Sequence, residues 1–178
     1  MLAFLRRCGR LSDRKARLFS AGCYRTNWAR MGEGEKRAVA TAERYADGLV
    51  GRKALATANK AANDACCAAY RDAGRAACYA ARAVGGSELN WPVLCGLLRD
   101  LFGPLPFRPV AIDPSWLTPP VVALAATIYD DRAWGDLPIL GDALQEAGCS
   151  DAEVLAHCHG PAFHARGCWV VDLLLNKE

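Results

Sequence analysis

The chain has 178 residues, of which 52% are hydrophobic and 23% are charged, and its formal net charge is +3 at pH 7. This composition excludes an intrinsically disordered protein, and the length suits one domain, or one domain with a helical extension. Apolar runs such as residues 121–129 are too short to cross a bilayer, which takes about 20 apolar residues, so no membrane partner is expected.

Cysteine usage and the N-terminal residues predict a cytoplasmic protein. The chain has nine cysteines, an odd number, and two of them, Cys66 and Cys67, are adjacent in an alanine-rich stretch. Residues 1–11 lack the apolar core and the small-residue cleavage site of a secretion signal. Reduced thiols are therefore expected rather than a disulfide scaffold.

The first half of the chain predicts helices from its apolar spacing and its capping residues. Ser12 is a candidate N-cap for the second helix, and Gly48 is a candidate stop for the third. Alanine dominates the fourth stretch, which is either one long helix or two helices that meet near Gly74. The expected helices span residues 1–8, 12–31, 33–47 and 52–84.

The second half continues with helices on either side of a proline-rich segment. A helix that starts near Asn90 is expected to end at about 102, and six prolines then fall within residues 103–120. Phe107 and Trp116 are expected to anchor this ordered connector by becoming buried. Further helices are expected over 118–131, over 137–147, over 150–158, and from His164 or Arg166 to 175. The third of these begins with a capping box at Ser150.

Because no strand alternation is visible, the predicted fold class is all-α. The expected architecture is a multi-helix bundle with a basic, alanine-rich N-terminal lobe (1–102), the proline-rich connector (103–120) and a C-terminal lobe (121–178), which together form one compact unit.

Charge is unevenly distributed. Residues 1–60 carry fourteen Lys/Arg and five Asp/Glu, whereas residues 61–178 carry eight and fourteen. A basic face for nucleic acid is one interpretation, with Tyr24 and Trp28 available for stacking. Solvated helix faces, or attraction between the two parts of the chain, are the other interpretations. The candidate nucleic-acid-binding residues are Arg14, Lys15, Arg17, Arg25 and Arg30.

The last thirty residues hold a dense Cys/His cluster, and its candidate metal ligands are Cys149, His157, Cys158, His164 and Cys168. Zinc takes four such groups in a tetrahedron. The preferred set is Cys149, Cys158, His164 and Cys168, with His157 able to replace Cys158. The spacing matches no zinc finger, ribbon or knuckle. The alternative is that the cysteines fill apolar gaps and the histidines cap helices or bind backbone groups.

A catalytic interpretation is less favoured. On a helix that begins at His164, the residues His164, Cys168 and Asp172 would share one face, yet three groups in a row on one helix do not converge on a substrate. No phosphate loop, dinucleotide fingerprint or hydrolase motif is present, so an enzyme is not expected. Asp172 lies in an apolar run and needs a buried partner, such as Arg108, His164 or a helix N-terminus.

Several strings resemble a heavily duplicated bacterial protein family, of the kind found in planctomycete genomes, for which no activity or cofactor is established. They are SDRKARLF (12–19), ERYADGL (43–49), FRPVAIDPSWLT (107–118), LPILGDALQEAGC (137–149) and HARGCWVVDLLL (164–175). The resemblance covers most of the chain. Two features depart from the family pattern: an acidic, Trp-containing N-terminal segment is missing, and His159 stands where an arginine is common.

The sequence thus favours a helical binding or adaptor module for a protein partner, with a structural Cys/His cluster that is a candidate zinc site. A nucleic-acid-associated protein that uses the basic N-terminal helices is the alternative.

Overall fold

The structure is a computed structural model that describes residues 2–61, 91–107, 110–160 and 163–177. All regular structure in these ranges is helical, and no β-strand is present in them, which confirms the all-α prediction. The chain forms two compact units, Met1–Cys95 and Gly96–Glu178, and the division falls within helix α7 (Trp91–Phe102).

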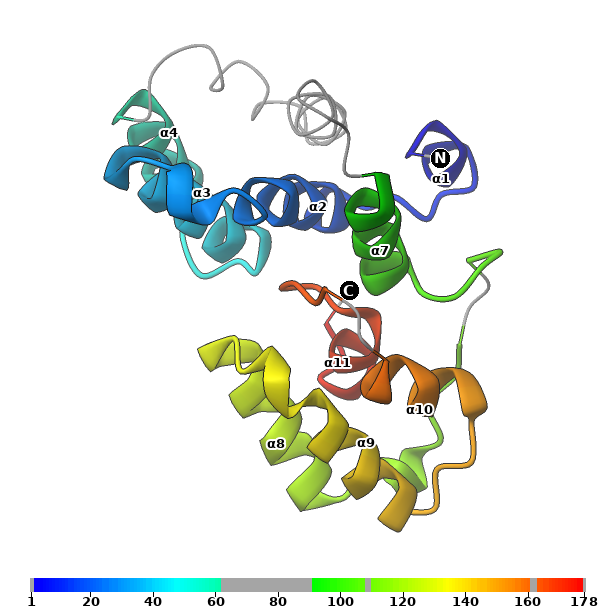
Figure 1. Ribbon diagram of the computed structural model, residues 1–178. Coiled ribbons are helices and arrows are strands. Elements are labelled where there is room, and N and C mark those ends of the chain that lie inside the picture. The colour runs from blue at the N-terminus through cyan, green and yellow to red at the C-terminus, as the bar shows by residue number, and fades with distance from the viewer. Residues whose placement is uncertain (1, 62–90, 108–109, 161–162, 178) are drawn as a thin grey trace. The chain divides into compact units, whose positions relative to one another are not determined.

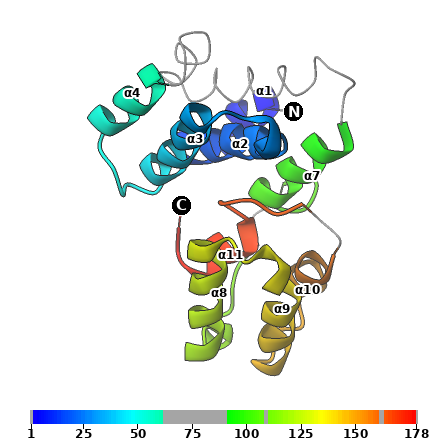
Figure 2. The same cartoon turned by 60° about the vertical axis from the view of Figure 1, so that its left-hand side comes forward.

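The N-terminal unit is built around α2, α3 and α4. Helix α3 packs against both α2 and α4, and α2 and α3 lie side by side in both views (Figures 1 and 2). Ser12 caps α2 as predicted, because its Oγ accepts a hydrogen bond from the backbone N–H of Lys15 at 3.2 Å. The described helices of this unit are α1 (Leu2–Arg7), α2 (Asp13–Arg25), the short 3-10 helix η1 (Trp28–Arg30), α3 (Glu33–Ala46) and α4 (Arg52–Ala61).

The predicted second helix (12–31) extends too far at its C-terminal end, since α2 ends at Arg25 and the 3-10 helix η1 follows. The alanine-rich stretch begins as a helix at Arg52, as predicted, but residues 62–90, including Gly74, Cys66 and Cys67, lie outside the described residues.

The C-terminal unit contains the second half of α7 and four further α-helices. Helix α9 packs against α8 and α10, and α11 packs against α8 and α10. Together they enclose a continuous apolar cluster that includes Val121, Ile128, Leu140 and Val171. The elements are α7, the 3-10 helix η3 (Pro114–Trp116), α8 (Pro119–Asp131), the 3-10 helix η4 (Trp134–Asp136), α9 (Leu137–Glu146), α10 (Ala152–His159) and α11 (Trp169–Leu174).

The proline-rich connector is anchored as predicted. Phe107 is 6% exposed and its ring lies edge-on to that of Phe102, with 6.4 Å between centroids. Trp116 is partly buried against the apolar cluster. Helix α8 then starts after Thr118 with proline in its first turn, where a missing N–H costs nothing.

Two helix starts in the C-terminal unit differ from the prediction. Asp151, rather than Ser150, caps α10, because its carboxylate accepts from the N–H groups of Glu153 and Val154 at 2.8 and 3.1 Å. The last helix begins at Trp169, not at His164 or Arg166. His164 therefore lies in the segment before α11, and the expected helical face with His164, Cys168 and Asp172 does not exist.

A glycine sets the distance between α9 and α10. A Cβ atom at Gly141 would lie 2.7 Å from Nε2 of His159 and 3.0 Å from Cβ of Cys158, which is too close for a real side chain. Glycine at this position lets α10, which carries His157, approach α9 closely. None of the described helices combines the length and apolar character that a bilayer-spanning segment requires.

Candidate metal centre

Four side chains with metal-binding atoms meet inside the C-terminal unit. Asp100 comes from α7, His157 from α10, and Cys168 is the residue that precedes the first turn of α11. His164 comes from the segment between α10 and α11. One ligand atom from each residue lies within 4.8 Å of the other three.

The carboxylate of Asp100 is the hub of this group. Its Oδ1 lies 2.8 Å from Nδ1 of His164 and 3.3 Å from Nε2 of His157. Its Oδ2 accepts a hydrogen bond from the backbone N–H of Ala165 at 2.9 Å. One oxygen of Asp100 thus faces the two rings, and the other is fixed by the backbone.

His157 joins Asp100 to Cys168. The same Nε2 atom that faces Asp100 lies 3.1 Å from Sγ of Cys168. The ring of His157 is also edge-on to that of His164, with 5.0 Å between centroids, and 5.2 Å from the ring of Trp169. These aromatic neighbours restrict the orientation of the His157 ring.

The group is closed to solvent. The side chain of Asp100 is 0% exposed, that of His164 is 5% and that of His157 is 11%. Cys168 as a whole residue is 0% exposed. Since the four groups account for a complete tetrahedron, the geometry resembles structural zinc sites more than catalytic ones, which keep one position open.

The electrostatics of the group favour a cation. Burial raises the pKa of the Asp100 carboxyl, but hydrogen bonds to His157 and His164 and the charge of both rings lower it by more, so the pKa lies below its usual value. Burial raises the pKa of the Cys168 thiol well above its usual value, and the charge of Asp100 adds to this rise. A bound divalent cation would reverse the tendency of the thiol to stay protonated.

The arrangement does not work as a Cys-His-Asp catalytic triad. In such a triad one ring nitrogen faces the nucleophile and the other faces the carboxylate. Here the single atom Nε2 of His157 faces both Cys168 and Asp100. A buried, protonated thiol is also a poor nucleophile.

The same distances suit a shared metal ion. With about 2.0–2.1 Å from zinc to nitrogen and about 2.3 Å to sulfur, neighbouring ligands of a tetrahedral ion lie roughly 3.3–3.7 Å apart. Of the contacts between these ligand atoms, those of 2.8 and 3.1 Å are shorter than this range, and that of 3.3 Å lies at its lower end. A small outward movement of the side chains would therefore make room for an ion.

The structure brings together three of the five sequence-predicted ligands, namely His157, His164 and Cys168. Cys149 and Cys158 instead belong to the apolar cluster, as the gap-filling alternative proposed. Burial raises the pKa of Cys158 to about 12, and the charge of nearby Cys149 adds to the rise. His157, rather than Cys158, thus points to the group of four.

Asp100 was missed by the sequence reasoning. It lies 57 positions before His157, outside the Cys/His-rich segment, in the apolar stretch Leu97, Leu98, Leu101 and Phe102, all of which are buried. An acidic residue in such a stretch needs a buried partner. The same signal is present at Asp172, which is itself 3% exposed on α11.

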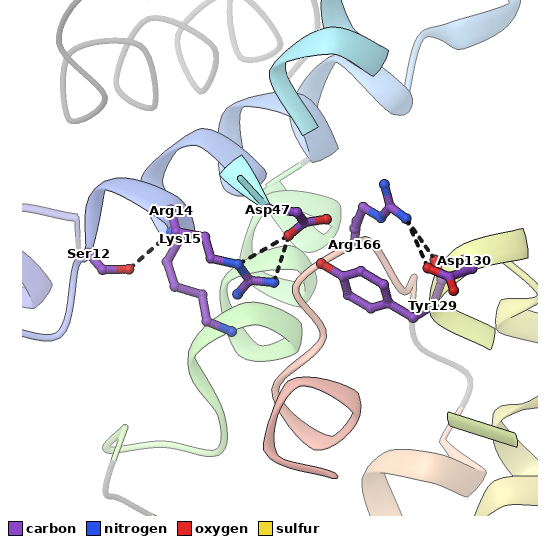
Figure 3. A network of polar contacts seen from close by, with 7 residues as sticks. All are labelled: Ser12, Arg14, Lys15, Asp47, Tyr129, Asp130 and Arg166. Carbon is purple, nitrogen blue, oxygen red and sulfur yellow. Dashed lines mark hydrogen bonds and ion pairs between the residues drawn. The ribbon is translucent and has the colours of Figure 1, made fainter. Parts of the chain in front are cut away.

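The candidate nucleic-acid residues make contacts within the N-terminal unit. Nε and Nη2 of Arg14 lie 3.2 and 3.1 Å from Oδ1 of Asp47 (Figure 3). The guanidinium group of Arg25 donates to both carboxylate oxygens of Glu43, at 3.0 and 2.8 Å. Arg17 is 8% exposed and its guanidinium carbon lies 5.1 Å from the centre of the Tyr45 ring.

Arg14 and Arg25 of α2 therefore pair with acidic side chains of the same unit, within residues 1–60. Lys15 is partly exposed, and the side chain of Arg30 lies outside the described part of the chain. Nucleic-acid binding by this region stays a prediction.

Comparisons with protein-family models, with curated proteins and with solved structures gave no match.

Proposed function

We propose that the protein is a helical binding or adaptor module whose C-terminal unit contains one structural zinc ion. Asp100, His157, His164 and Cys168 are the ligands. The observation that carries the proposal is the convergence of two imidazole nitrogens, one thiol and one carboxylate oxygen within 4.8 Å in a buried position.

The ligand types favour zinc among the common metals. Calcium and magnesium prefer six or more oxygen ligands, and this group offers one carboxylate. Imidazole, thiolate and carboxylate in a tetrahedral set match zinc, and a structural zinc ion adds its binding energy to folding. The ion would link α7, α10 and the start of α11, three elements that are distant in sequence or separated by irregular segments.

Two features support the adaptor role: the burial of the site and the helical surface around it. A buried ion with four protein ligands has no open position for a substrate, so we assign the function to the surface of the protein. Apolar side chains available to a protein partner include Leu105 at 50% exposed, Ile139 at 56% and Phe163 at 38%. Replacing Ile139 with Asp should weaken partner binding without changing the zinc content.

Native and denaturing mass spectrometry of protein produced without added metal tests the proposal directly. The native spectrum should show one zinc ion per chain, and the denaturing spectrum should show none. If the native mass equals that of the chain alone, and if zinc added afterwards does not bind, the proposal is wrong.

Cobalt substitution tests the ligand set. Tetrahedral Co²⁺ with a thiolate ligand has intense visible bands and a sulfur-to-metal charge-transfer band. The wild-type protein should show both, and Cys168→Ala should lose the charge-transfer band. Cys158→Ala is the matched control, because Cys158 is equally buried but lies outside the group of four.

A further inference from the structure

The second half of α7, residues 96–102, is where the chain enters the C-terminal unit. Within this half-helix, Asp100 is 1% exposed and carries a negative charge into the interior. The contacts of the Asp100 side chain therefore help to determine whether the half-helix stays docked.

The polar contacts of the Asp100 side chain lead to one later segment, residues 157–168. Its two oxygens face His157, His164 and the backbone of Ala165, and the thiol of Cys168 lies beside the same carboxylate. Beyond the helix end, the ring of Trp169 packs at Gly103, where it would lie 3.8 Å from an added Cβ atom. The half-helix also buries the apolar side chains of Leu97, Leu98 and Leu101, but among the described residues the apolar cluster enclosed by α8 to α11 is composed of residues between 110 and 175.

The three other ligands belong to that same later segment. His157, His164 and Cys168 lie within twelve residues, next to the apolar cluster, so an ion can stay on them when α7 moves. Asp100 is the one ligand from α7. A bond from Asp100 to the ion would therefore connect the half-helix to the core of α8 to α11, which is stabilised by its own apolar cluster.

Resting on the proposed zinc site, we infer that the ion is a latch for the second half of α7. With zinc bound, residues 96–102 are docked on the C-terminal core through Asp100. When zinc is lost, this half-helix opens while α8 to α11 stay folded. Zinc availability would then control the helix through which the chain passes from one unit to the other.

Tryptic cleavage after Arg99 tests the latch, because Arg99 is exposed on the docked helix and protease needs the helix to open locally. At free zinc about 100-fold above the dissociation constant, the open population should fall by up to about 100-fold, and by less to the extent that the three other ligands still bind zinc in the open form. Cleavage after Arg99 in the full-length protein should thus be up to about 100-fold faster in chelator than in zinc. Lys53 in α4 is an exposed control site whose cleavage should not change.

Asp100→Asn separates the latch from metal binding itself. Asparagine keeps the shape of the side chain and an oxygen for the N–H of Ala165, but it loses the charge that binds zinc. The variant should still bind zinc through three ligands, more weakly. Because residue 100 follows the bond that trypsin cuts, the informative comparison is within the variant, where cleavage after Arg99 should be equally fast with and without zinc. Unchanged cleavage after Lys53 and an unchanged helical circular dichroism signal would show that the variant is folded.

The outcomes distinguish the latch from the zinc site. If the wild-type protein binds zinc but is cut after Arg99 equally fast with and without chelator, the latch is wrong and the zinc site stands. If chelator also accelerates cleavage after Arg132, at the end of α8, the ion holds the whole unit and the latch is again wrong. If no zinc binds, both proposals are wrong.

Discussion

Nε2 of His157 lies 3.1 Å from Sγ of Cys168, and the same atom lies 3.3 Å from Oδ1 of Asp100. A single proton on this nitrogen can form a good hydrogen bond to only one of these two neighbours. A cation located between the three atoms would interact with both neighbours at once. This relationship is the reason for interpreting the group as a metal site instead of a proton relay.

Metal removal should lower the stability of the C-terminal unit. A ligand present at 1,000 times its dissociation constant stabilises the folded state by about 4.1 kcal/mol, so chelation of a tightly bound ion should cost a similar amount. Thermal unfolding followed by circular dichroism, with and without chelator, measures the loss. Restoring zinc should restore the original transition, and an unaltered transition in chelator would contradict the prediction.

Cys168→Ala and Cys158→Ala should separate a ligand from a core residue. Both cysteines are fully buried, so both variants lose packing and are expected to be destabilised by about 1–2 kcal/mol from this cause. Only Cys168→Ala should also lose zinc and become insensitive to chelator. Equal zinc content in the two variants would show that Cys168 is not a ligand.

Removal of Arg25 should be costly because Glu43, at 3% side-chain exposure, would remain buried without this partner. The loss of one member of a buried pair costs about 3–5 kcal/mol, and the 19% exposure of Arg25 favours the lower end of that range. Arg25→Lys should recover only part of the lost free energy of unfolding. Lysine cannot donate to both oxygens as the guanidinium does, and it cannot stack on Trp28, whose ring centre lies 3.8 Å from the guanidinium carbon.

The pair of Lys36 and Glu33 is the control for Arg25, because Glu33 is 80% exposed. Lys36→Ala should leave the denaturation midpoint unchanged. Chemical denaturation of the three variants gives the comparison. A small effect of Arg25→Ala would free this residue for the nucleic-acid alternative, which retention on heparin at low salt would then test.

Cys23 should make the N-terminal unit sensitive to alkali. Burial raises the pKa of Cys23 from 9.0 to about 12 in the folded state. Below pH 9 the thiol is protonated in both states, so its contribution to stability is intact. Above pH 9 the unfolded state alone loses the proton, and stability should fall by up to about 1.36 kcal/mol per pH unit as the pH rises toward 12.

Denaturation midpoints between pH 8 and 10.5 measure this slope. Cys23→Ala should have a shallower slope than the wild-type protein, and Cys8→Ala, which alters an exposed thiol, should have the same slope as the wild type. Identical slopes in all three proteins would mean that Cys23 ionises as easily in the folded state as in the unfolded one.

Gly141→Ala should destabilise the contact between α9 and α10. Alanine gains about 1 kcal/mol in helix propensity, but its Cβ would meet the ring of His159 and the Cβ of Cys158. Overpacking of this kind costs about 1–3 kcal/mol. The net change should be a loss, and His159→Ala in the same chain should recover part of it, because the ring is the closer of the two obstacles.

The helices could be predicted from the sequence where caps and apolar periodicity agree. Ser12, the Thr118–Pro119 pair and Gly48 mark helix ends that the structure has within a residue or two. The start of α11 was wrong because the apolar run after Arg166 looks helical, whereas the backbone at Gly167 has a positive φ of 96° and turns before the helix begins.

The site could be predicted only in part, for a physical reason. His157, His164 and Cys168 attract attention because soft ligands are rare and here are close in sequence. Asp100 carries no such signal, since carboxylates are common and its nearest partner is 57 positions away. Asp100 can be recognised as the fourth candidate ligand only from the structure, in which α7 places it beside the other three residues. The family resemblance and the cytoplasmic location stay predictions.

The long interval between Asp100 and His157 has a consequence for recognising distant homologues. No residue in the described part of the proline-rich connector belongs to the group of four, and each doubling of a loop's length costs only about 0.6 kcal/mol in closure entropy. Insertions or deletions there should be tolerated, whereas the interval from His157 to Cys168 is constrained because His157, His164 and Cys168 must all reach Asp100. A search pattern should therefore keep His-x6-His-x3-Cys rigid and let the distance back to an aspartate in an apolar helix vary freely.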